Sequence, residues 1–464
     1  MKDSNKFIES NNIDSKDLSK HATSQQTFLE KIFSVKKDEV KILLTSLSFI
    51  FLIFASYAIL RPIRDALGLS NGKEELKWLF LGTFIATLCA SILAMWLSSV
   101  IARKTYITAI FVFFSLNLLG FYIALYFIDS NHKSASFIWL ARIFYVWVSV
   151  FNVFIISSAW SLLADIFTRE RSKRLFGIIA AGASLGSIVG AAAISLLIKH
   201  IGTQDFILVS LVILGFCLVL KTLLLKESYA LLDSIESKGE FESRFNATIG
   251  AKNPFAGFKI IVKSRFLLAF VGFILLLTSI STFLYMEQAR VISELFPHDM
   301  KGAKEARIAA FANIDLVVQT LSFIIQIFFT AKIAEFLGLR WLLSLLGFAV
   351  GLGFVGLFIC KEMGIVSLLP IAIVMSIRRV GEYALVKPGR EMLFVPLDSD
   401  SKYKVKNFLD TVVYRGGDAL SAQVESLAMR VSLGFTLLFG AFLSFLWGLL
   451  GLFLSKKYDK NNFS

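Results

Sequence analysis

Long apolar runs, separated by short polar connections, dominate this chain of 464 residues. A helix needs about 20 mostly apolar residues to cross a membrane. A chain in lipid must also satisfy its own backbone hydrogen bonds, which favours helices. Twelve runs meet this requirement, and we place them at 40–60, 78–98, 106–128, 137–163, 175–198, 206–225, 266–286, 308–333, 341–360, 365–386, 408–429 and 431–454. The sequence therefore predicts an all-α polytopic membrane protein with 12 transmembrane helices.

The run at 408–429 is the most polar of the twelve. It contains the charged residues Asp410, Arg415, Asp418 and Glu425. We keep it because the distribution of Lys and Arg favours an even number of crossings. Basic residues are concentrated in alternate connections and in the C-terminal tail, so both termini are predicted to be cytoplasmic. The net charge of +14 is then expected to reflect basic connections that face the cytoplasm and its anionic lipids, and not a surface that binds nucleic acid.

The predicted helices fall into two bundles of six. Residues 226–265 form the longest polar interruption, with seven basic and five acidic residues, and six runs lie on either side. We therefore expect bundles at 40–225 and 266–454, a cytoplasmic linker between them, and cytoplasmic tails at 1–39 and 455–464. In the first tail, a short amphipathic helix is indicated by Phe28, Leu29, Ile32 and Phe33. Two bundles joined in this way are typical of transporters whose solute site lies between them.

Cysteine and histidine are scarce. The cysteines are Cys89, Cys217 and Cys360, and the histidines are His21, His132, His200 and His298. The cysteines lie far apart in apolar runs and the histidines in polar stretches, which argues against a zinc cluster and against haem ligation within the membrane. The chain also lacks a phosphate-binding glycine loop and the motifs of metalloproteases and serine hydrolases. We therefore predict no cofactor, no metal and no enzymatic activity.

Polar residues inside four of the runs recur at helical spacing. Lipid tolerates few polar groups, so these residues are expected to face protein or water. The stripes are Tyr57, Arg61 and Arg64; Arg142, Tyr145, Ser149 and Asn152; Thr278, Ser281, Tyr285 and Gln288; and Asp315, Gln319, Ser322 and Gln326. Hydrogen bonding between helices would explain any one stripe. Four stripes, spread over both halves, favour a shared aqueous cavity.

The charges inside the runs and at their ends indicate that this cavity is cationic. The candidate substrate-binding residues are Arg61, Arg64, Arg142, Tyr285, Lys387, Arg390 and Arg415. Guanidinium groups pair well with phosphate or carboxylate oxygens, so an anionic solute is expected. The candidate proton carriers or gating residues are Asp165, Glu287, Asp315 and Asp418. For Asp65, Glu391 and Asp410 we prefer ion pairs that link helices.

The run at 175–198 has glycines four residues apart, at Gly182, Gly186 and Gly190. On a helix this spacing leaves one edge nearly bare, which permits another helix to approach closely. We predict that this edge serves helix packing and does not bind the solute.

Several stretches resemble a known family. They are ILRPIRDALGL at 59–69, WSLLADIFTRERSKRLFG at 160–177, GEYALVKPGREMLFVPL at 381–397 and KYKVKNFLDTVVYRGGD at 402–418. These stretches resemble the nucleotide transporter family, which comprises the ATP/ADP exchangers of obligate intracellular bacteria and plastids and their bacterial relatives. That family is distantly related to the major facilitator superfamily. The likeness covers about 40–454, and the two C-terminal motifs are its most specific part.

The resemblance implies that two basic residues contact phosphates. Arg64 stands in the LRPIRD motif and Arg415 before the glycine step of YRGGD, where the family has basic residues. The family also has acidic residues in its fourth and seventh helices. An ungapped alignment places Val148 and Tyr285 there, with Glu287 two positions from the second. These departures fit the broader bacterial branch better than ATP/ADP exchange itself.

The sequence therefore predicts a secondary transporter that works by alternating access in a bacterial inner membrane. Its solute is expected to be a small anion of nucleotide-like kind, moved by exchange or by proton coupling. A transporter of another solute, such as a sugar phosphate, an organic anion or a peptide, is the alternative. A polytopic membrane enzyme or a scaffold is the third hypothesis. We expect a monomer whose other contacts are with membrane lipid.

Overall fold

The computed structural model describes residues 37–128, 134–232, 235–248, 258–328, 330–394, 405–406 and 408–459. Within these ranges the chain is helical, and its only extended pairing is an isolated bridge between Ala102 and Thr248. This agrees with the predicted all-α class. The amphipathic helix predicted from residues 28–33 lies outside the described residues.

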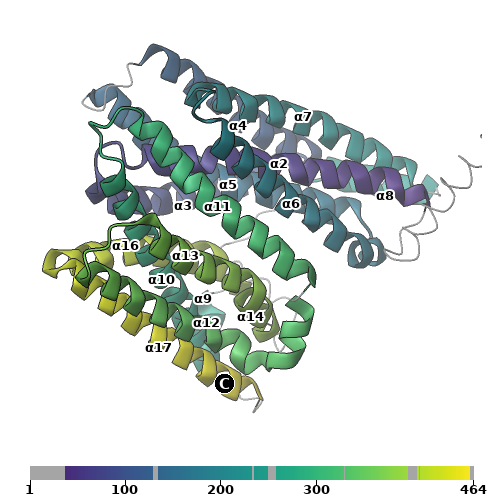
Figure 1. Ribbon diagram of the computed structural model, residues 1–464. Coiled ribbons are helices and arrows are strands. Elements are labelled where there is room, and N and C mark those ends of the chain that lie inside the picture. Colours follow the sequence, from purple (N-terminus) through teal and green to yellow (C-terminus); the bar gives the residue numbers. More distant parts are fainter. Residues whose placement is uncertain are drawn as a thin grey trace, which may run out of the picture.

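Six long helices form the first half of the molecule (Figure 1). They are α2 (Val40–Leu67), α3 (Leu76–Val100), α4 (Arg103–Phe127), α5 (Ala135–Ile166), α6 (Arg169–Leu197) and α7 (Thr203–Ala230), with the 3-10 turns η1 (Lys37–Glu39) and η2 (Lys73–Glu75) before α2 and α3. Each long helix covers one of the first six apolar runs. The start of α6 is set by Thr168, whose hydroxyl accepts a hydrogen bond from the Arg171 backbone N–H.

The second half contains long helices together with helices that are too short to cross a membrane on their own. They are α10 (Arg265–Leu295), α11 (Ala303–Phe328), α12 (Thr330–Glu362), α13 (Leu368–Gly381), α14 (Lys387–Leu393), α16 (Tyr414–Val431) and α17 (Leu433–Asp459). Ser264 and Ser367 cap α10 and α13 in the same way as Thr168 caps α6. Helix α12 bends at Gly338, whose φ of 65° lies in the left-handed region that favours glycine.

Two of the twelve predicted spans are interrupted helices. Between α13 and α14 lies η3 (Glu382–Val386), and directly before α16 lies η4 (Leu409–Val413); each is a single turn of π-helix. Ten helices among the described residues are long and apolar enough to cross a membrane, and these two segments are not among them. Single π-helical turns are rare and are frequently found at functional sites. Twelve crossings and cytoplasmic termini therefore stay predictions.

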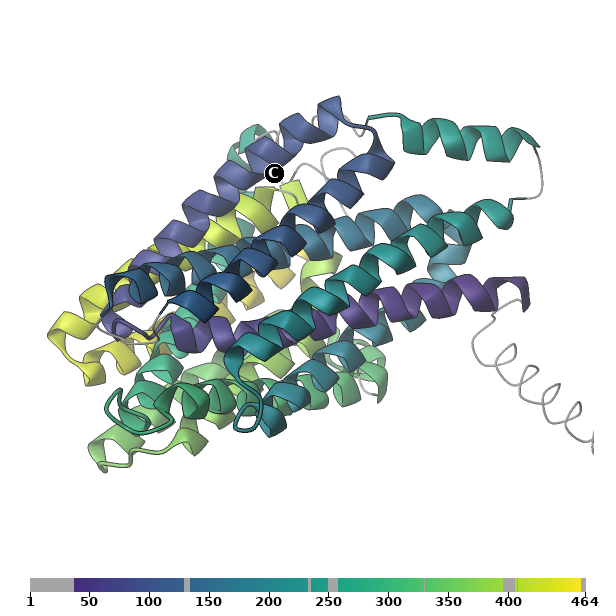
Figure 2. The same cartoon turned by 90° about the horizontal axis from the view of Figure 1, so that it is seen from above.

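The linker holds two short helices, α8 (Ile235–Asn246) and α9 (Phe258–Lys263). Helix α8 lies beside α4 at one edge of the first half (Figure 2). Arg244 donates a hydrogen bond of 3.3 Å to the backbone carbonyl of Asp165, and the Arg103 backbone N–H donates one of 3.0 Å to the carbonyl of Ala247. The linker is thus attached to the first half by hydrogen bonds that backbone carbonyl groups accept.

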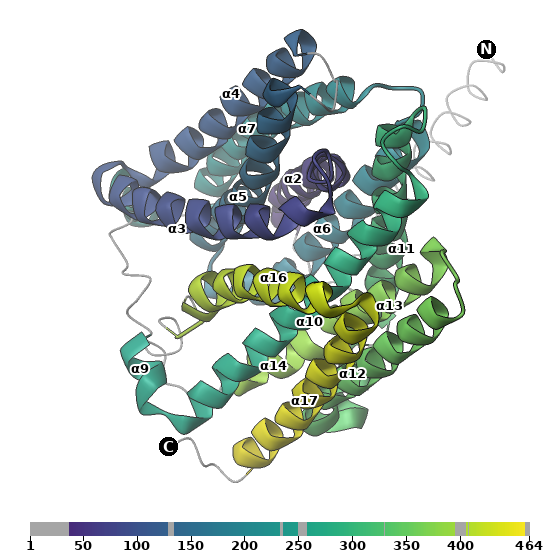
Figure 3. The same cartoon turned by 90° about the vertical axis from the view of Figure 1, so that its left-hand side faces the viewer.

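The two halves meet at the end of the molecule opposite the linker. We call this the far end; it carries the connections 68–72 and 296–302. Gln423 of α16 donates a hydrogen bond of 3.0 Å to the backbone carbonyl of Lys77 in α3. Figure 3 shows α16 between α3 and α10. One hydrophobic cluster also joins the first half to the far-end parts of α10 and α11, including Ile292 and Phe311. A second cluster lies within the second half.

Within each half, one pair of helices packs backbone against backbone. A Cβ atom at Gly190 of α6 would lie 2.5 Å from the Ala55 carbonyl oxygen of α2, and one at Gly182 would lie 2.8 Å from that of Leu47. In the second half, a Cβ at Gly451 of α17 would lie 2.5 Å from the Leu343 carbonyl oxygen of α12. The predicted close packing along the glycine edge of α6 is confirmed.

Gly186→Ala is expected to destabilise the protein, because the new methyl group would meet the Phe51 carbonyl of α2. Overpacking of this kind costs typically about 1–3 kcal/mol. Gly177→Ala on the same helix is the matched control, since a Cβ there meets nothing within 4 Å. The thermal midpoints of the two variants in detergent would be compared with that of the wild type. Equal midpoints for both variants would contradict close packing at Gly186.

Candidate functional site

A cavity of about 630 Å³ lies between the two halves. This volume is in the roughly 300–1,000 Å³ range of small-molecule sites. Ten residues of the four predicted stripes line it: Tyr57, Arg61, Arg64, Tyr145, Ser149, Asn152, Ser281, Tyr285, Asp315 and Gln319. The helical periodicity of polar residues therefore does converge on one shared space, to which α2, α5, α10 and α11 each contribute a face.

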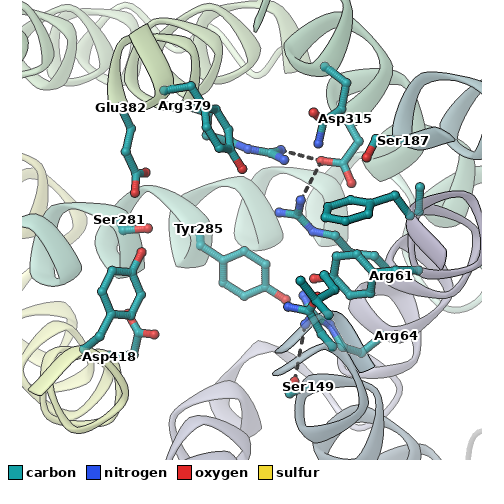
Figure 4. A pocket seen from close by; sticks show the side chains of 18 of the residues that line it. Arg61, Arg64, Ser149, Ser187, Ser281, Tyr285, Asp315, Arg379, Glu382 and Asp418 are labelled. Atoms are coloured by element: carbon teal, nitrogen blue, oxygen red, sulfur yellow. Dashed lines mark hydrogen bonds and ion pairs between the residues drawn. The ribbon is translucent and has the colours of Figure 1, made fainter. Parts of the chain in front are cut away.

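Asp315 joins the two halves in the cavity. Its carboxylate forms an ion pair with Arg379 of α13 and lies 3.5 Å from the guanidinium of Arg61 on α2 (Figure 4). Asp315 and Arg379 are both buried, at 7% and 4% exposure. One carboxylate is thus shared by two guanidinium groups, one from each half.

A second contact between the halves surrounds Arg64. Its guanidinium donates to Asp65 at 2.6 Å and to the hydroxyl of Ser149 at 3.3 Å. The hydroxyl of Tyr285, from α10, donates to the same Asp65 oxygen at 3.0 Å and accepts a hydrogen bond from Tyr145. Arg64 also lies over the Tyr145 ring, 5.2 Å from its centre. These contacts hold the Arg64 side chain at the cavity surface between α2, α5 and α10.

The second half supplies most of the charge in the cavity. Arg378 pairs with Glu382 at 3.0 Å, while Arg415 and Asp418 are held more loosely, at 3.8 Å. Lys387 lies over the Tyr383 ring, 4.5 Å from its centre, and makes no ion pair with the described residues. These residues come from α13, η3, α14 and α16, the two interrupted spans.

The cavity has an excess of positive charge. Six basic and three acidic side chains line it: Arg61, Arg64, Arg378, Arg379, Lys387 and Arg415, with Asp315, Glu382 and Asp418. Asp65, bonded to Arg64, adds a fourth carboxylate. These ten side chains together therefore carry a net charge of +2, and Asp315 is shared by two of the arginines. In a space walled by protein, this excess attracts anions more strongly than it would in open water.

Four of the sequence-predicted site residues lie away from this cavity and pair elsewhere. Arg142 donates to Glu75, Arg390 lies 3.3 Å from Asp410, Asp165 pairs with Arg103 at 2.9 Å, and Glu287 pairs with Arg290 at 2.5 Å. The other seven line it: Arg61, Arg64, Tyr285, Asp315, Lys387, Arg415 and Asp418.

The list of predicted site residues omitted several side chains that line the cavity. Arg378, Arg379 and Glu382 lie nine, eight and five residues before Lys387, and Tyr414 directly precedes Arg415. A helical projection of the tenth run would have placed Arg378 and Glu382 on one face, four residues apart. The π-helical turn after Gly381 shifts that projection, so the position of Lys387 relative to them could not be read from it.

Comparisons with known proteins agree with this architecture. A family model described as Major Facilitator Superfamily matches residues 40–382. No curated protein shows a significant match. A solved POT family transporter in complex with a thioalcohol-conjugated peptide has a TM-score of 0.63 and 11% identity, covering 91% of this chain and 99% of its own.

Two further solved structures are similar at the same level. A POT family transporter in complex with 5-aminolevulinic acid has a TM-score of 0.62 and 12% identity, covering 89% of this chain and 96% of its own. A bacterial homologue of the human lysosomal transporter Spinster, in an inward-facing and unoccupied conformation, has a TM-score of 0.59 and 14% identity, covering 93% and 99%. At these identities the likeness is one of fold.

Asp315→Asn is expected to lower the thermal midpoint strongly, because it leaves Arg61 and Arg379 without their shared carboxylate. Breaking a buried pair in this way costs about 3–5 kcal/mol. Added pyrophosphate should stabilise the variant more than the wild type, since an anion in the cavity can supply the missing negative charge. Glu362→Gln, at an exposed ion pair, is the control. An Asp315→Asn protein with a wild-type midpoint would contradict this role.

Proposed function

Because the chain belongs to the major facilitator superfamily and is a secondary transporter of that type, we propose that it moves a phosphate-bearing, nucleotide-like anion. The observation that carries the proposal is the positive excess of the cavity between the halves. Charged side chains inside a membrane protein are energetically costly. A neutral or cationic solute would not be attracted by six basic side chains, whereas an anionic solute would.

Arg64 and Arg415 are the residues to which we assign the phosphates. They line the cavity from opposite halves, so one solute could be held by both at once. Arg415 is the more available, since its carboxylate partner lies at 3.8 Å. A planar guanidinium donates two parallel hydrogen bonds to a phosphate, which suits it to this task. The resemblance of 59–69 and 402–418 to nucleotide transporters supports the same assignment.

Alternating access would follow from the way the halves meet. Hydrogen bonds and a hydrophobic cluster hold them together at the far end. The lining residues Trp160, Ala180 and Lys387 lie toward the linker end of their helices. With both termini cytoplasmic, as the charge distribution predicts, this state would be closed toward the outside. Rocking of the halves about the bound solute would open the far end.

The coupling mode is either exchange or proton coupling, and Asp418 is our candidate for a proton carrier. It lines the cavity, its ion pair is long, and its other partner is the Thr282 hydroxyl at 3.4 Å. Asp165 and Glu287 are engaged in closer ion pairs away from the cavity, and Asp315 is held by two guanidinium groups. Asp418 is therefore the carboxylate that could change partners most easily.

The same cavity also suits solutes other than nucleotides. The POT structures hold a conjugated peptide and 5-aminolevulinic acid, and a sugar phosphate or another organic anion would also match a cationic site. Transport of a panel that includes ATP, ADP, glucose 6-phosphate and a dipeptide by purified protein in liposomes would separate these possibilities.

Arg64→Ala and Arg415→Ala are each expected to raise the KM for the transported anion about tenfold to a hundredfold, since a hydrogen bond to a charged group contributes about 1.5–3 kcal/mol. Uptake into proteoliposomes at graded anion concentrations measures this. Arg430→Ala is the control, because Arg430 is an exposed residue on the same helix as Arg415. Wild-type KM values for every anion in the panel would refute the phosphate assignment.

Asp418→Asn is expected to abolish uptake driven by an imposed pH gradient, because an amide cannot carry a proton. Counterflow exchange of labelled solute across the membrane should persist. Glu391→Gln, at an ion pair on the second half that does not line the cavity, serves as the control. If the variant keeps gradient-driven uptake, Asp418 is not the proton carrier.

A further inference from the structure

The two walls of the cavity differ in chemistry. The second half contributes seven charged residues to its lining, spread over α11, α13, η3, α14 and α16. The first half contributes only two, Arg61 and Arg64, both on α2. The remaining side chains of the first half are aromatic, aliphatic, small or neutral polar. We call these nine charged residues together the charged wall. A single charged group could be bound by the charged wall alone, so the uncharged side chains of the first half need a separate explanation.

One region of the first-half wall carries no charge. It faces the cavity toward the linker end, and we call it the uncharged wall. It consists of Phe54, Ile156, Trp160, Ala180, Ala183 and Ser184, from α2, α5 and α6. Its residues are only partly buried, so apolar surface is exposed to a space that also holds charges.

The uncharged wall lies at a distance from the arginines of the same half. Phe54 precedes Arg61 by seven residues on α2, and Trp160 follows Asn152 by eight on α5. At 1.5 Å per residue, these separations are about 10–12 Å along the helix axes. A solute that reaches from the level of Arg61 to this wall therefore extends over about two helical turns.

The side chains of this wall suit a flat, uncharged ring. Trp160 offers an indole face, and its orientation is set by Phe176, whose ring lies edge-on at 5.9 Å. Ala180 and Ala183 on α6 line the same cavity, and their short side chains fill little of it. Apolar surface left open to water is unfavourable unless a ligand or partner covers it. Aromatic side chains cover the face of a nucleic acid base well, whatever its sequence identity.

We propose that the uncharged wall binds the base ring of the solute, so that the transporter selects a nucleoside phosphate over an inorganic polyphosphate of equal charge. This inference rests on the proposed function, because it assumes that the charged wall holds phosphates. The ring would stack on Trp160 beside Ala183, while the phosphates extend toward Arg61, Arg64 and Arg415.

Two probes of similar charge test the proposal, ATP and inorganic tripolyphosphate. Their dissociation constants are measured on the purified full-length protein by equilibrium binding. The wild type should bind ATP more tightly. Trp160→Ala should weaken ATP binding about five- to hundredfold, the range for loss of one aromatic stacking partner, and leave tripolyphosphate binding unchanged.

Further variants guard against misfolding and non-specific effects. Trp160→Phe should restore most of the ATP affinity, because it keeps an aromatic face. Ala183→Leu should weaken ATP binding selectively by filling part of the cavity at the uncharged wall. Trp96→Ala is the matched control, since Trp96 is an exposed tryptophan on α3 that does not line the cavity.

The possible failures are distinguishable. If the wild type binds neither probe, the phosphate proposal fails and this inference fails with it. If the wild type binds both probes equally, or if Trp160→Ala and Ala183→Leu weaken both to the same degree, the charged wall still binds phosphates but the uncharged wall does not bind a ring. Selective loss of ATP binding in both variants, with rescue by Trp160→Phe, supports the assignment.

Discussion

A guanidinium group inside a membrane has to be matched by a carboxylate or by water, and this requirement organises the molecule. Arg61, Arg64 and Arg379 line the cavity between the halves, and each has a carboxylate within reach. Because Asp315 serves Arg61 and Arg379 together, the charge balance of each half depends on the other. The halves are therefore coupled electrostatically at the place where the solute would bind, and an anion that enters competes directly with that coupling.

The same requirement explains why two of the predicted spans are not regular apolar helices. The segments around η3 and η4 carry Glu382, Lys387 and Arg415 to the cavity. A span with this many charges cannot be stabilised by lipid, so it has to be enclosed by protein and water. A π-helical turn in each one adds a residue to the local turn and redirects the side chains that follow. Low hydropathy and irregular backbone therefore occur together at the residues that bear the charge.

The sequence predicted the helices and much of the cavity, but not the partners of its charges. Apolar runs locate the helices because length and composition are local properties, and the stripes converged because polar residues avoid lipid. Arg142 shares a stripe with Tyr145 and Ser149, yet it donates to Glu75 at the far end. Periodicity gives the face of a helix but not which neighbour lies opposite each turn. The pairing of Arg379 with Asp315 was not predicted for this reason, since the two residues are 64 positions apart in the sequence.

The contacts within each half differ in kind from those between the halves, and this difference favours rigid-body motion. In the α2–α6 and α12–α17 pairs, glycines lie directly against backbone carbonyl groups of the neighbouring helix, and these groups cannot adjust by changing rotamer. The halves instead meet in the cavity through side chains of Tyr285, Asp315 and Arg61, which can exchange partners by rotating about single bonds. Packed interiors resist continuous deformation, whereas hydrogen-bonded side chains have discrete alternatives. A solute that replaces the shared carboxylate would therefore loosen the boundary between the halves and leave each bundle intact.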